Sequence, residues 1–365
     1  MEQLLQQISA FVNMFHSLLD LPRDTCKYVI SGTTPFRLSS KKMLPNKRQD
    51  TPNRNFGGNR QNIEKGMRVV WQADKGYKLV QVDQSGADAL IVAHLCRKGK
   101  YRSLFENNVK PHTYIALKLF KNEWQKHFST SEINEAIKAP IEELVKLKFW
   151  PELNKLIKSS DDWEHGKRYY FLGKKIVHGG SYGMFENTLI LAVFKDTNGL
   201  VRISKEEAKN FLFGSTGFHS EFPEIKEWHQ RVYIEAKKTR QLRNLFGFPY
   251  NITDYINKDD YKDLIAWVPA STVACITRNA FIKTHEYITN KDRDWHLLHD
   301  THDSYLVEAR EGEELECAKH MQEQLGVDLV SPVDGTKFKM KSEASVGWNW
   351  SPYKKDSNPL GMKAI

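Results

Sequence analysis

Residues 78–95 constrain the fold more than any other part of this chain. The first half alternates like a half-buried strand, with Val80 and Val82 on one face and Asp83 on the other. After Gly86 the apolar residues change to helical spacing. Asp83 therefore marks the end of a strand, at the rim of a sheet. A carboxylate there can cap the strand or bind a metal ion, and by itself the position favours the cap.

The composition is that of a soluble globular protein with two or three subdomains. Of the 365 residues, 40% are hydrophobic and 27% are charged, which suffices for a sizeable core. No apolar run reaches membrane-spanning length, and the N-terminus lacks the features of a signal peptide. The cysteines lie far apart in the sequence, which argues against a zinc site or disulfide framework. We therefore expect a reducing, cytoplasmic location and no membrane partner.

Positive charge is concentrated near the N-terminus. The chain carries a net charge of +9, and residues 21–70 hold eleven Lys and Arg against three acids. Asn, Gln and the aromatic Phe56 are interleaved with these cations. The segment is either a solvated basic loop or an arm that binds nucleic-acid phosphates, and the second reading is at least as good as the first.

The order of patterns predicts an α+β fold. Residues 1–20 have the spacing of one amphipathic helix, residues 21–66 have few periodic segments, and residues 67–95 hold a strand pair and a helix. Residues 98–244 are mostly helical in pattern, and strands return in residues 245–365. We therefore expect an antiparallel sheet built from two separated segments, with a helical subdomain inserted between them.

A second group of side chains lies in residues 168–184. Lys174, His178 and Tyr182 are four residues apart, so on a helix they share one face. A cation, an imidazole and an aromatic ring in a row suit the phosphate, sugar and base of a nucleotide. Taken alone, a solvated lysine above two half-buried rings is the better reading.

A third group lies in residues 295–309, where two strand-like runs flank Asp303-Ser304 as in a tight hairpin. Asp303 at its tip could meet Asp83 at the rim of a neighbouring strand. Two carboxylates at close range repel each other unless a divalent cation lies between them. Asp300 should leave the opposite face of its strand, so we do not expect it to be a ligand.

These three segments resemble, in order and separation, motifs A, B and C of the family-A DNA polymerases, the bacterial DNA polymerase I group. The resemblance extends over roughly residues 28–352. Each motif is weak alone, but all of them together in the right order are specific. Phe36–Ser40 resembles the family's Gly-Arg-Leu-Ser-Ser segment, and Gln61-Asn62-Ile63 with Arg68 resembles its Gln-Asn-Ile-Pro segment and downstream Arg. Pro111–Thr113 resembles its Asp-Ile-His segment. Two further matches are Asn244–Gly247 and Gly347–Trp350.

The resemblance implies a catalytic role for the acids. Asp83 and Asp303 would bind two Mg²⁺ ions, with the carbonyl of Gln84 as a further ligand. One ion would activate the primer 3′-hydroxyl, and the other would hold the triphosphate and the leaving pyrophosphate. Lys174 would neutralise the phosphate charge as pyrophosphate departs.

The resemblance also implies contacts to nucleotide and DNA. His112 would touch the phosphates, Tyr182 would stack beside the new base pair, and His178 would face the sugar and base. Asp88 would stand at the sugar's 2′ position. The implied DNA-binding residues are Arg37, Gln61, Asn62, Arg68 and His302.

The chain also departs from the family pattern. Asp88 stands where the family has Glu, and His178 stands where it has Phe or Tyr. Tyr170 occupies the place of an arginine that contacts the triphosphate, and Arg168 or Lys175 could substitute for it. These departures are typical of a divergent, phage-like branch, which would place the protein in a host cytoplasm.

Only about thirty residues precede the Arg-Leu-Ser-Ser match. They are too few for the thumb and exonuclease-like domains that family members carry there. We therefore expect a palm (residues 21–97 and 245–365) and fingers (98–244) alone. A separate thumb, exonuclease or clamp protein would complete the enzyme.

The sequence thus predicts a template-directed DNA polymerase module acting on primer-template DNA and dNTPs. A single-subunit RNA polymerase is a near alternative because it shares the palm, although the carboxylate at Asp88 favours the DNA enzymes. A polymerase-derived DNA-binding subunit without catalysis is the alternative from another class, and the retained acids and Lys174 argue against it. A primer-extension assay with dNTPs and rNTPs separates the three.

Overall fold

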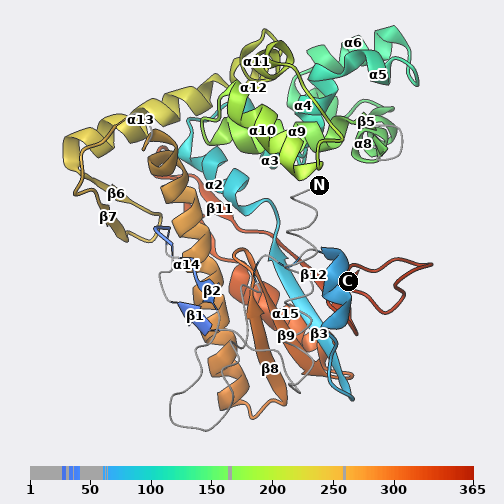
Figure 1. Cartoon of the computed structure of the whole chain (residues 1–365), viewed down its shortest axis with the longest axis vertical. Helices are drawn as coiled ribbons and strands as arrows, with labels where there is room; N and C mark the ends of the chain where they lie inside the picture. Colours follow the sequence, from blue (N-terminus) through green and yellow to red (C-terminus); the bar gives the residue numbers. More distant parts are fainter. Residues whose placement is uncertain are drawn as a thin grey trace. The chain divides into compact units, whose positions relative to one another are not determined.

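The computed structural model describes residues 27–29, 33–35, 37–41, 61, 63, 65–162, 167–257 and 260–365 (Figure 1). The chain divides into two compact units. The first, here called the sheet unit, comprises the described residues up to Ala87 together with residues 270–329 and 339–365. The second, here called the helical unit, comprises residues 88–269 and 330–338.

The sheet unit is built on one five-stranded antiparallel sheet. Its central strand is the predicted one, and its neighbours come from the C-terminal quarter of the chain. The strand order is β13 (Lys363–Ala364), β12 (Ser342–Gly347), β3 (Tyr77–Gln84), β9 (Ser304–Arg310) and β8 (Trp295–Asp300). The antiparallel sheet assembled from separated segments agrees with the prediction.

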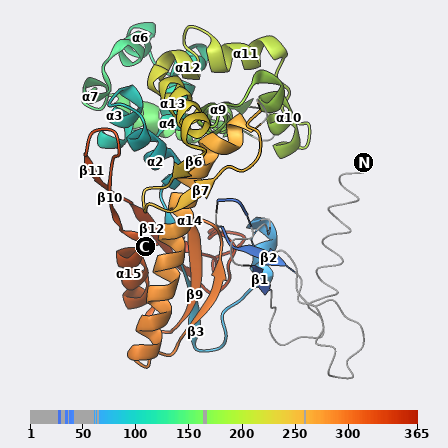
Figure 2. The ribbon, with the colours of Figure 1, turned by 90° about the vertical axis from the view of Figure 1, so that its left-hand side faces the viewer.

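Helices cover one face of this sheet. They are α14 (Tyr261–Asn290), through its second half, and α15 (Glu314–Leu325), and both lie on the same side of β3 and β9 in Figure 2. Val80 and Val82 are completely buried. Tyr305, opposite Val82 in β9, bonds through its hydroxyl to Thr284 of α14 (2.9 Å). The apolar side of the strand alternation therefore packs against helices.

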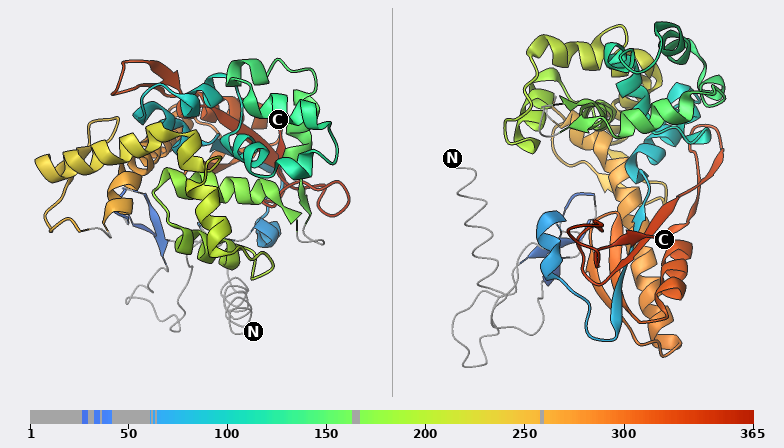
Figure 3. Two further views of the ribbon diagram at one scale, coloured as in Figure 1. Left: turned by 90° about the horizontal axis from the view of Figure 1, so that it is seen from above. Right: turned by 90° about the vertical axis from the view of Figure 1, so that its right-hand side faces the viewer.

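The opposite face carries Leu79, Gln81 and Asp83 and is covered by irregular segments. Leu79 packs with Ile63 and Trp350. The short helix η1 (Lys65–Val70) lies on this side, visible in the right-hand view of Figure 3. The Gln81 amide donates to the Ser304 hydroxyl and accepts from the Trp350 indole, each at 2.9 Å. The side chain of Gln81 is thus fixed by hydrogen bonds on both sides.

The helical unit packs short helices around an aromatic-rich core. α6 and α11 begin with capping boxes, in which a serine and a glutamate three residues later satisfy each other's backbone amides. The helices are α2 (Ala87–Leu95), α3 (Lys100–Glu106), α4 (Pro111–Leu119), α5 (Lys121–Trp124), α6 (Thr130–Lys138), α7 (Ile141–Leu144), α8 (Trp150–Lys158), α9 (Tyr169–Ser181), α10 (Glu186–Asp196), α11 (Lys205–Phe213), α12 (Phe218–Glu221), α13 (Pro223–Thr239) and the first part of α14.

The remaining strands form two-stranded pairs. They are β1 (Lys27–Val29) with β2 (Ser39–Lys41), β4 (Asp161–Asp162) with β5 (Lys167–Arg168), β6 (Gln241–Arg243) with β7 (Pro249–Asn251), and β10 (Asp328–Val330) with β11 (Lys337–Lys339). The helix predicted for residues 1–20 and most of the basic segment lie outside the described residues.

The division of the chain differs from the predicted domain boundaries. It falls after Ala87 and after Pro269, rather than after residues 97 and 244. Residues 330–338 also join the helical unit, because buried Arg102 donates to the Ala93 and Cys96 carbonyls and pairs with Asp334. A periodic pattern identifies a buried helix but not the neighbours that bury it.

Helix α14 continues through the division at Pro269. Among the helices of the described ranges, it is the one long and apolar enough to span a membrane. However, 72% of its most apolar 18-residue window is buried inside the protein. That burial is the pattern of a core helix, whose apolar length serves packing.

Candidate functional site

The two predicted acids come to one rim of the sheet. Asp83 pairs in register with Ser304, the first residue of β9. The backbone amide of Gln84 donates to the carbonyl of Asp303 (3.0 Å). Asp83 is exposed and Asp303 is half-buried. The ladder between two central strands therefore holds both aspartates at the same end of the sheet.

Gln84 ties this rim to α14. Its side chain is 1% exposed, and its amide donates to the Thr277 hydroxyl (2.6 Å). The Thr277 oxygen lies 3.1 Å from the carbonyl of His302, at the hairpin tip. The hairpin and the end of β3 are thus braced by one helix residue.

A third carboxylate was missed by the sequence reasoning. Glu343 of β12 pairs in register with Asp83, so it flanks this aspartate on the side away from Ser304, and it is exposed. No local signal could have found it, because the pairing joins residues 260 positions apart.

Carboxylate oxygens and a backbone carbonyl are the ligands that Mg²⁺ prefers, and the ion commonly takes only one or two protein carboxylates with substrate phosphates. The rim fits that donor set. Within the part of the chain that the structure describes, no group of three or more His, Cys, Asp or Glu is arranged to hold a metal ion. The rim is therefore not a dedicated all-protein cage.

The hairpin tip has an unusual backbone. His302 has a φ of 76°, in the left-handed region that side-chain-bearing residues seldom adopt. Its imidazole lines a small hollow with Arg37, Arg278 and Asp300. Burial lowers the pKa of His302, and the nearby charge of Arg37 lowers it further. Two of the predicted DNA-binding residues, Arg37 and His302, are therefore together.

Asp300 lies inside the protein, apart from the exposed rim. It is 4% exposed and accepts from the Gln61 amide (3.1 Å) and the His302 backbone amide (3.2 Å). Gln61 also accepts from the backbone amide of Ser40 (3.0 Å). A role for Gln61 at DNA would thus be indirect, through the position of the hairpin.

Arg68 contacts protein groups with its guanidinium. Its Nε donates to the Ile63 carbonyl (3.1 Å), and its Cζ lies 4.2 Å from the ring centroid of Trp350. Burial lowers its pKa, while the charge of Asp83 raises it. Arg68 is therefore close enough to act electrostatically on the acidic rim. Asn62, the remaining predicted DNA contact, lies outside the described residues.

The predicted nucleotide face lies on α9 in the helical unit. Leu172, Ile176 and Val177 are buried, whereas Lys174 and His178 are exposed. Tyr182 follows directly as the C-cap, and its ring centroid lies 5.2 Å from that of His178 in an edge-to-face arrangement. The three side chains thus follow the exposed side of one helix and its end.

His112 belongs to the same group. A Cβ added to Gly173 would lie 2.6 Å from the His112 carbonyl oxygen, so this glycine allows the first turn of α4 to press against α9. The His112 and Tyr170 rings are 6.0 Å apart. Burial, then the charges of Lys174, Lys110 and His178, lower the pKa of His112 to about 4. His112 is therefore neutral at neutral pH and within electrostatic range of Lys174 and Lys110.

Asp88 lies in the first turn of α2, near the end of α9. Its charge is among those that raise the pKa of Tyr101, for which burial is the main cause. The Tyr101 hydroxyl lies 3.3 Å from that of Ser181, the residue before Tyr182. Tyr101 therefore contacts the last residue of α9 and is within electrostatic range of Asp88.

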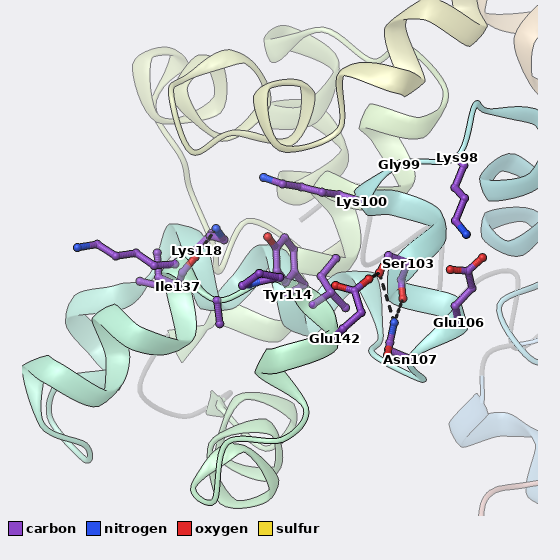
Figure 4. Close-up of a pocket in the computed structure, with 14 residues that line it drawn as sticks. Lys98, Gly99, Lys100, Ser103, Glu106, Asn107, Tyr114, Lys118, Ile137 and Glu142 are labelled. Carbon is purple, nitrogen blue, oxygen red and sulfur yellow. Dashed lines mark hydrogen bonds between the residues drawn. The ribbon is translucent and has the colours of Figure 1, made fainter.

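A separate cavity of about 630 Å³ lies between α3, α4 and α6 (Figure 4). It is lined by lysines from three segments, and its most buried cation, Lys118, is paired with Glu221 (3.5 Å). Glu221 also accepts from Lys100 (3.2 Å) and Tyr114 (3.1 Å). Because the charge of Lys118 is already paired with Glu221, we assign no function to this cavity.

No protein-family model matches the chain. Its fold is similar to a solved structure, the POL domain of Pol1 from M. smegmatis in complex with DNA primer-template and dNTP. The TM-score is 0.64 at 19% sequence identity, and the match covers 94% of this chain and 51% of that chain. This chain thus spans about half the length of the polymerase chain that it matches. It has the mixed helical and antiparallel-sheet fold of a DNA polymerase domain.

Proposed function

We propose that this chain is a template-directed DNA polymerase module of the family-A type. It adds dNTPs to a primer 3′-hydroxyl and releases pyrophosphate. The observation that carries the proposal is the register of β3 with β9, which brings Asp83 and Asp303 to one rim. The fold likeness to a polymerase domain solved with primer-template and dNTP supports it.

In this proposal the sheet unit acts as the palm and the helical unit as the fingers. Asp83, Asp303 and the Gln84 carbonyl hold two Mg²⁺ ions. When bound, such ions lower the pKa of the attacking hydroxyl and neutralise charge on the triphosphate. The protein's contribution is to bring the two aspartates to one rim, which the backbone pairing of β3 with β9 supports and the Gln84–Thr277 hydrogen bond braces.

The nucleotide side chains act from α4 and α9. Lys174 offers a point charge to the phosphates, and neutral His112 offers a hydrogen bond. Tyr182 stacks beside the nascent pair, with His178 against the sugar and base. Asp88 meets the 2′ position of the sugar.

The DNA side chains act from the sheet unit. Arg37 and His302 meet the primer terminus, and Arg68 lies beside the rim. Gln61 positions the hairpin that carries His302, and Asn62 follows Gln61 in the chain. Basic residues before position 70 add phosphate contacts.

A primer-extension assay tests the proposal. The purified chain should extend a primer on a DNA template with dNTPs and Mg²⁺ and should use rNTPs less well. Asp83→Asn and Asp303→Asn are matched controls, because they keep side-chain volume and remove charge. Equal extension by these variants and the wild type, or no extension by the wild type, would overturn the proposal.

A further inference from the structure

Cations gather where the first turn of α4 meets the exposed side of α9. The resemblance to family-A polymerases implies a phosphate-binding arginine at the place of Tyr170, so in the proposed function a different cation supplies that charge. Arg168 and Lys175 are the candidates nearest in sequence. A third candidate is Lys110, and the contacts of these three side chains show which of them is available to bind phosphate.

Arg168 and Lys175 are both engaged elsewhere. Arg168 is 1% exposed, and its guanidinium donates to the backbone carbonyl of Asp162 in the β4–β5 pair. Lys175 forms an ion pair with Asp196 at the end of α10. Moving either side chain to a phosphate would break an existing interaction, so neither is a ready substitute.

Lys110 is placed differently. It is the N-cap of α4, directly before Pro111, and it is exposed. Because Gly173 lets the His112 backbone approach α9, Lys110 stands at the junction of the two helices. Helices α4 and α9 lie next to each other in Figure 1. Lys110 is thus two residues from His112, whose ring lies beside Tyr170.

The charges that act on His112 at this junction have one sign, although the carboxylate of Asp161 accepts from the Phe171 backbone amide (3.1 Å) nearby. Lys110, Lys174 and His178 all act on His112, and each disfavours its protonated form. The charge of Lys110 also lowers the pKa of Lys158 at the end of α8, although burial is the larger cause. Across residues 65–162 and 167–257, no acidic side chain forms an ion pair with Lys110, Lys158 or Lys174. Unbalanced like charges repel, and a bound polyanion relieves the repulsion.

We propose that Lys110, supported by Lys158, binds the polyphosphate of the incoming nucleotide and replaces the charge that Tyr170 lacks. The ligand class is a nucleoside triphosphate, held between the start of α4 and the exposed side of α9. This inference rests on the proposed function, because the polymerase reaction supplies the ligand. It adds Lys110 and Lys158 to a site otherwise formed by Lys174 and His112.

The test compares Lys110→Gln and Lys158→Gln with Lys155→Gln, an exposed lysine one turn earlier on α8. The KM for dNTP should rise about tenfold in Lys110→Gln, because a charge-assisted contact of ordinary strength is lost. The kcat should change little, since the contact is made equally in ground and transition states. Lys158→Gln should have a smaller effect and Lys155→Gln none.

Inorganic tripolyphosphate provides a readout that needs no catalysis. Its affinity, measured by calorimetry, should fall in Lys110→Gln and stay unchanged in Lys155→Gln. NMR of His112 should show its pKa rising on tripolyphosphate addition, and rising less in Lys110→Gln.

The outcomes separate the two proposals. Wild-type dNTP KM and tripolyphosphate affinity in Lys110→Gln would overturn the assignment of Lys110 while leaving the polymerase intact. An unchanged KM with weakened DNA binding would also overturn it, since Lys110 would then contact the DNA backbone. If the wild type fails to extend primers yet binds tripolyphosphate through Lys110, the proposed polymerase function fails and the anion site stands.

Discussion

The backbone amide of Gln84 donates to the carbonyl of Asp303 at 3.0 Å, and this hydrogen bond joins the two candidate metal-binding segments. Asp83 and Asp303 are therefore placed by backbone pairing between β3 and β9. The ladder consists of backbone hydrogen bonds, so the two carboxylates do not take part in it. Function and folding can consequently be separated by mutation at these two positions.

Replacing Asp83 or Asp303 with Ala should abolish nucleotide addition while leaving the fold intact. In the proposed function these acids hold Mg²⁺, and without the metal their like charges and that of Glu343 would repel one another. The melting temperature without metal should therefore hold or rise, as followed by circular dichroism. Primer extension by either variant near the wild-type rate would contradict the two-metal proposal.

Binding to DNA should depend strongly on salt through the basic segment. Neutralising Lys41, Lys42, Lys47 and Arg48 together removes up to four phosphate contacts, each adding about 0.9 to the slope of log affinity against log salt. The slope, measured by fluorescence anisotropy, should therefore flatten by up to about 3 to 4.

The control for this measurement is Lys126→Gln with Lys146→Gln. Both amines are already paired with glutamates three residues earlier, so they should release few counterions. A slope that the four changes leave unaltered would mean that the basic segment does not contact DNA.

Local patterns predicted the parts of the site that depend on local structure. The alternation in β3 and the four-residue spacing in α9 follow from backbone geometry alone. The sequence could therefore place Asp83 at a strand end and Lys174 and His178 on one helix face, as the structure has them. The same spacing predicted that Tyr182 lies on this helix face, but Tyr182 is the C-cap, just beyond the helix end.

Long-range packing decided the rest. Whether α2 joins the sheet or the helices depends on what buries Ile91 and Val92, and their own spacing carries no such information. The pairing of Glu343 with Asp83 and the burial of the Gln61 amide arise likewise from contacts between distant segments. Sequence reasoning therefore identified residue types and order better than boundaries and partners.

Acid should destabilise the helical unit through two buried histidines. Burial lowers the pKa of His219 to about 3 and of His229 to about 4. Between about pH 6.5, where unfolded histidine titrates, and pH 4, the unfolded chain binds more protons than the folded one. Stability should thus fall as pH drops through this range, by up to about 1.4 kcal/mol per pH unit for each histidine.

His219→Phe tests this effect. The His219 ring stacks on Phe213 with centroids 5.2 Å apart, so a phenyl ring should keep the contact and remove the titration. The fall in melting temperature between pH 7 and 5 should be smaller in this variant. His127→Asn, an exposed position, should leave the pH dependence unchanged. An equal pH dependence in His219→Phe and the wild type would mean that His219 does not titrate on unfolding.

If the proposed function holds, discrimination between deoxyribose and ribose should be weaker than in family-A polymerases, for which the resemblance implies Glu in place of Asp88. The shorter side chain reaches about 1.5 Å less far, on ordinary bond lengths, toward a 2′-hydroxyl. A missing clash of this kind is worth on the order of 1–3 kcal/mol, or about ten- to two-hundredfold in selectivity. The ratio of dNTP to rNTP efficiency, measured by single-nucleotide extension, should therefore rise in Asp88→Glu.

A neighbouring variant separates a direct gate from a change in packing. The Tyr101 hydroxyl is 3.3 Å from the Ser181 oxygen, and the charge of Asp88 is among those that raise the pKa of Tyr101. Tyr101→Phe removes this hydrogen bond but keeps the ring, so it should change the sugar ratio less than Asp88→Glu does. If Asp88→Glu leaves the ratio unchanged, Asp88 is not the gate. If Tyr101→Phe raises the ratio as much, the position of the α9 end, rather than the reach of the carboxylate, sets the selectivity.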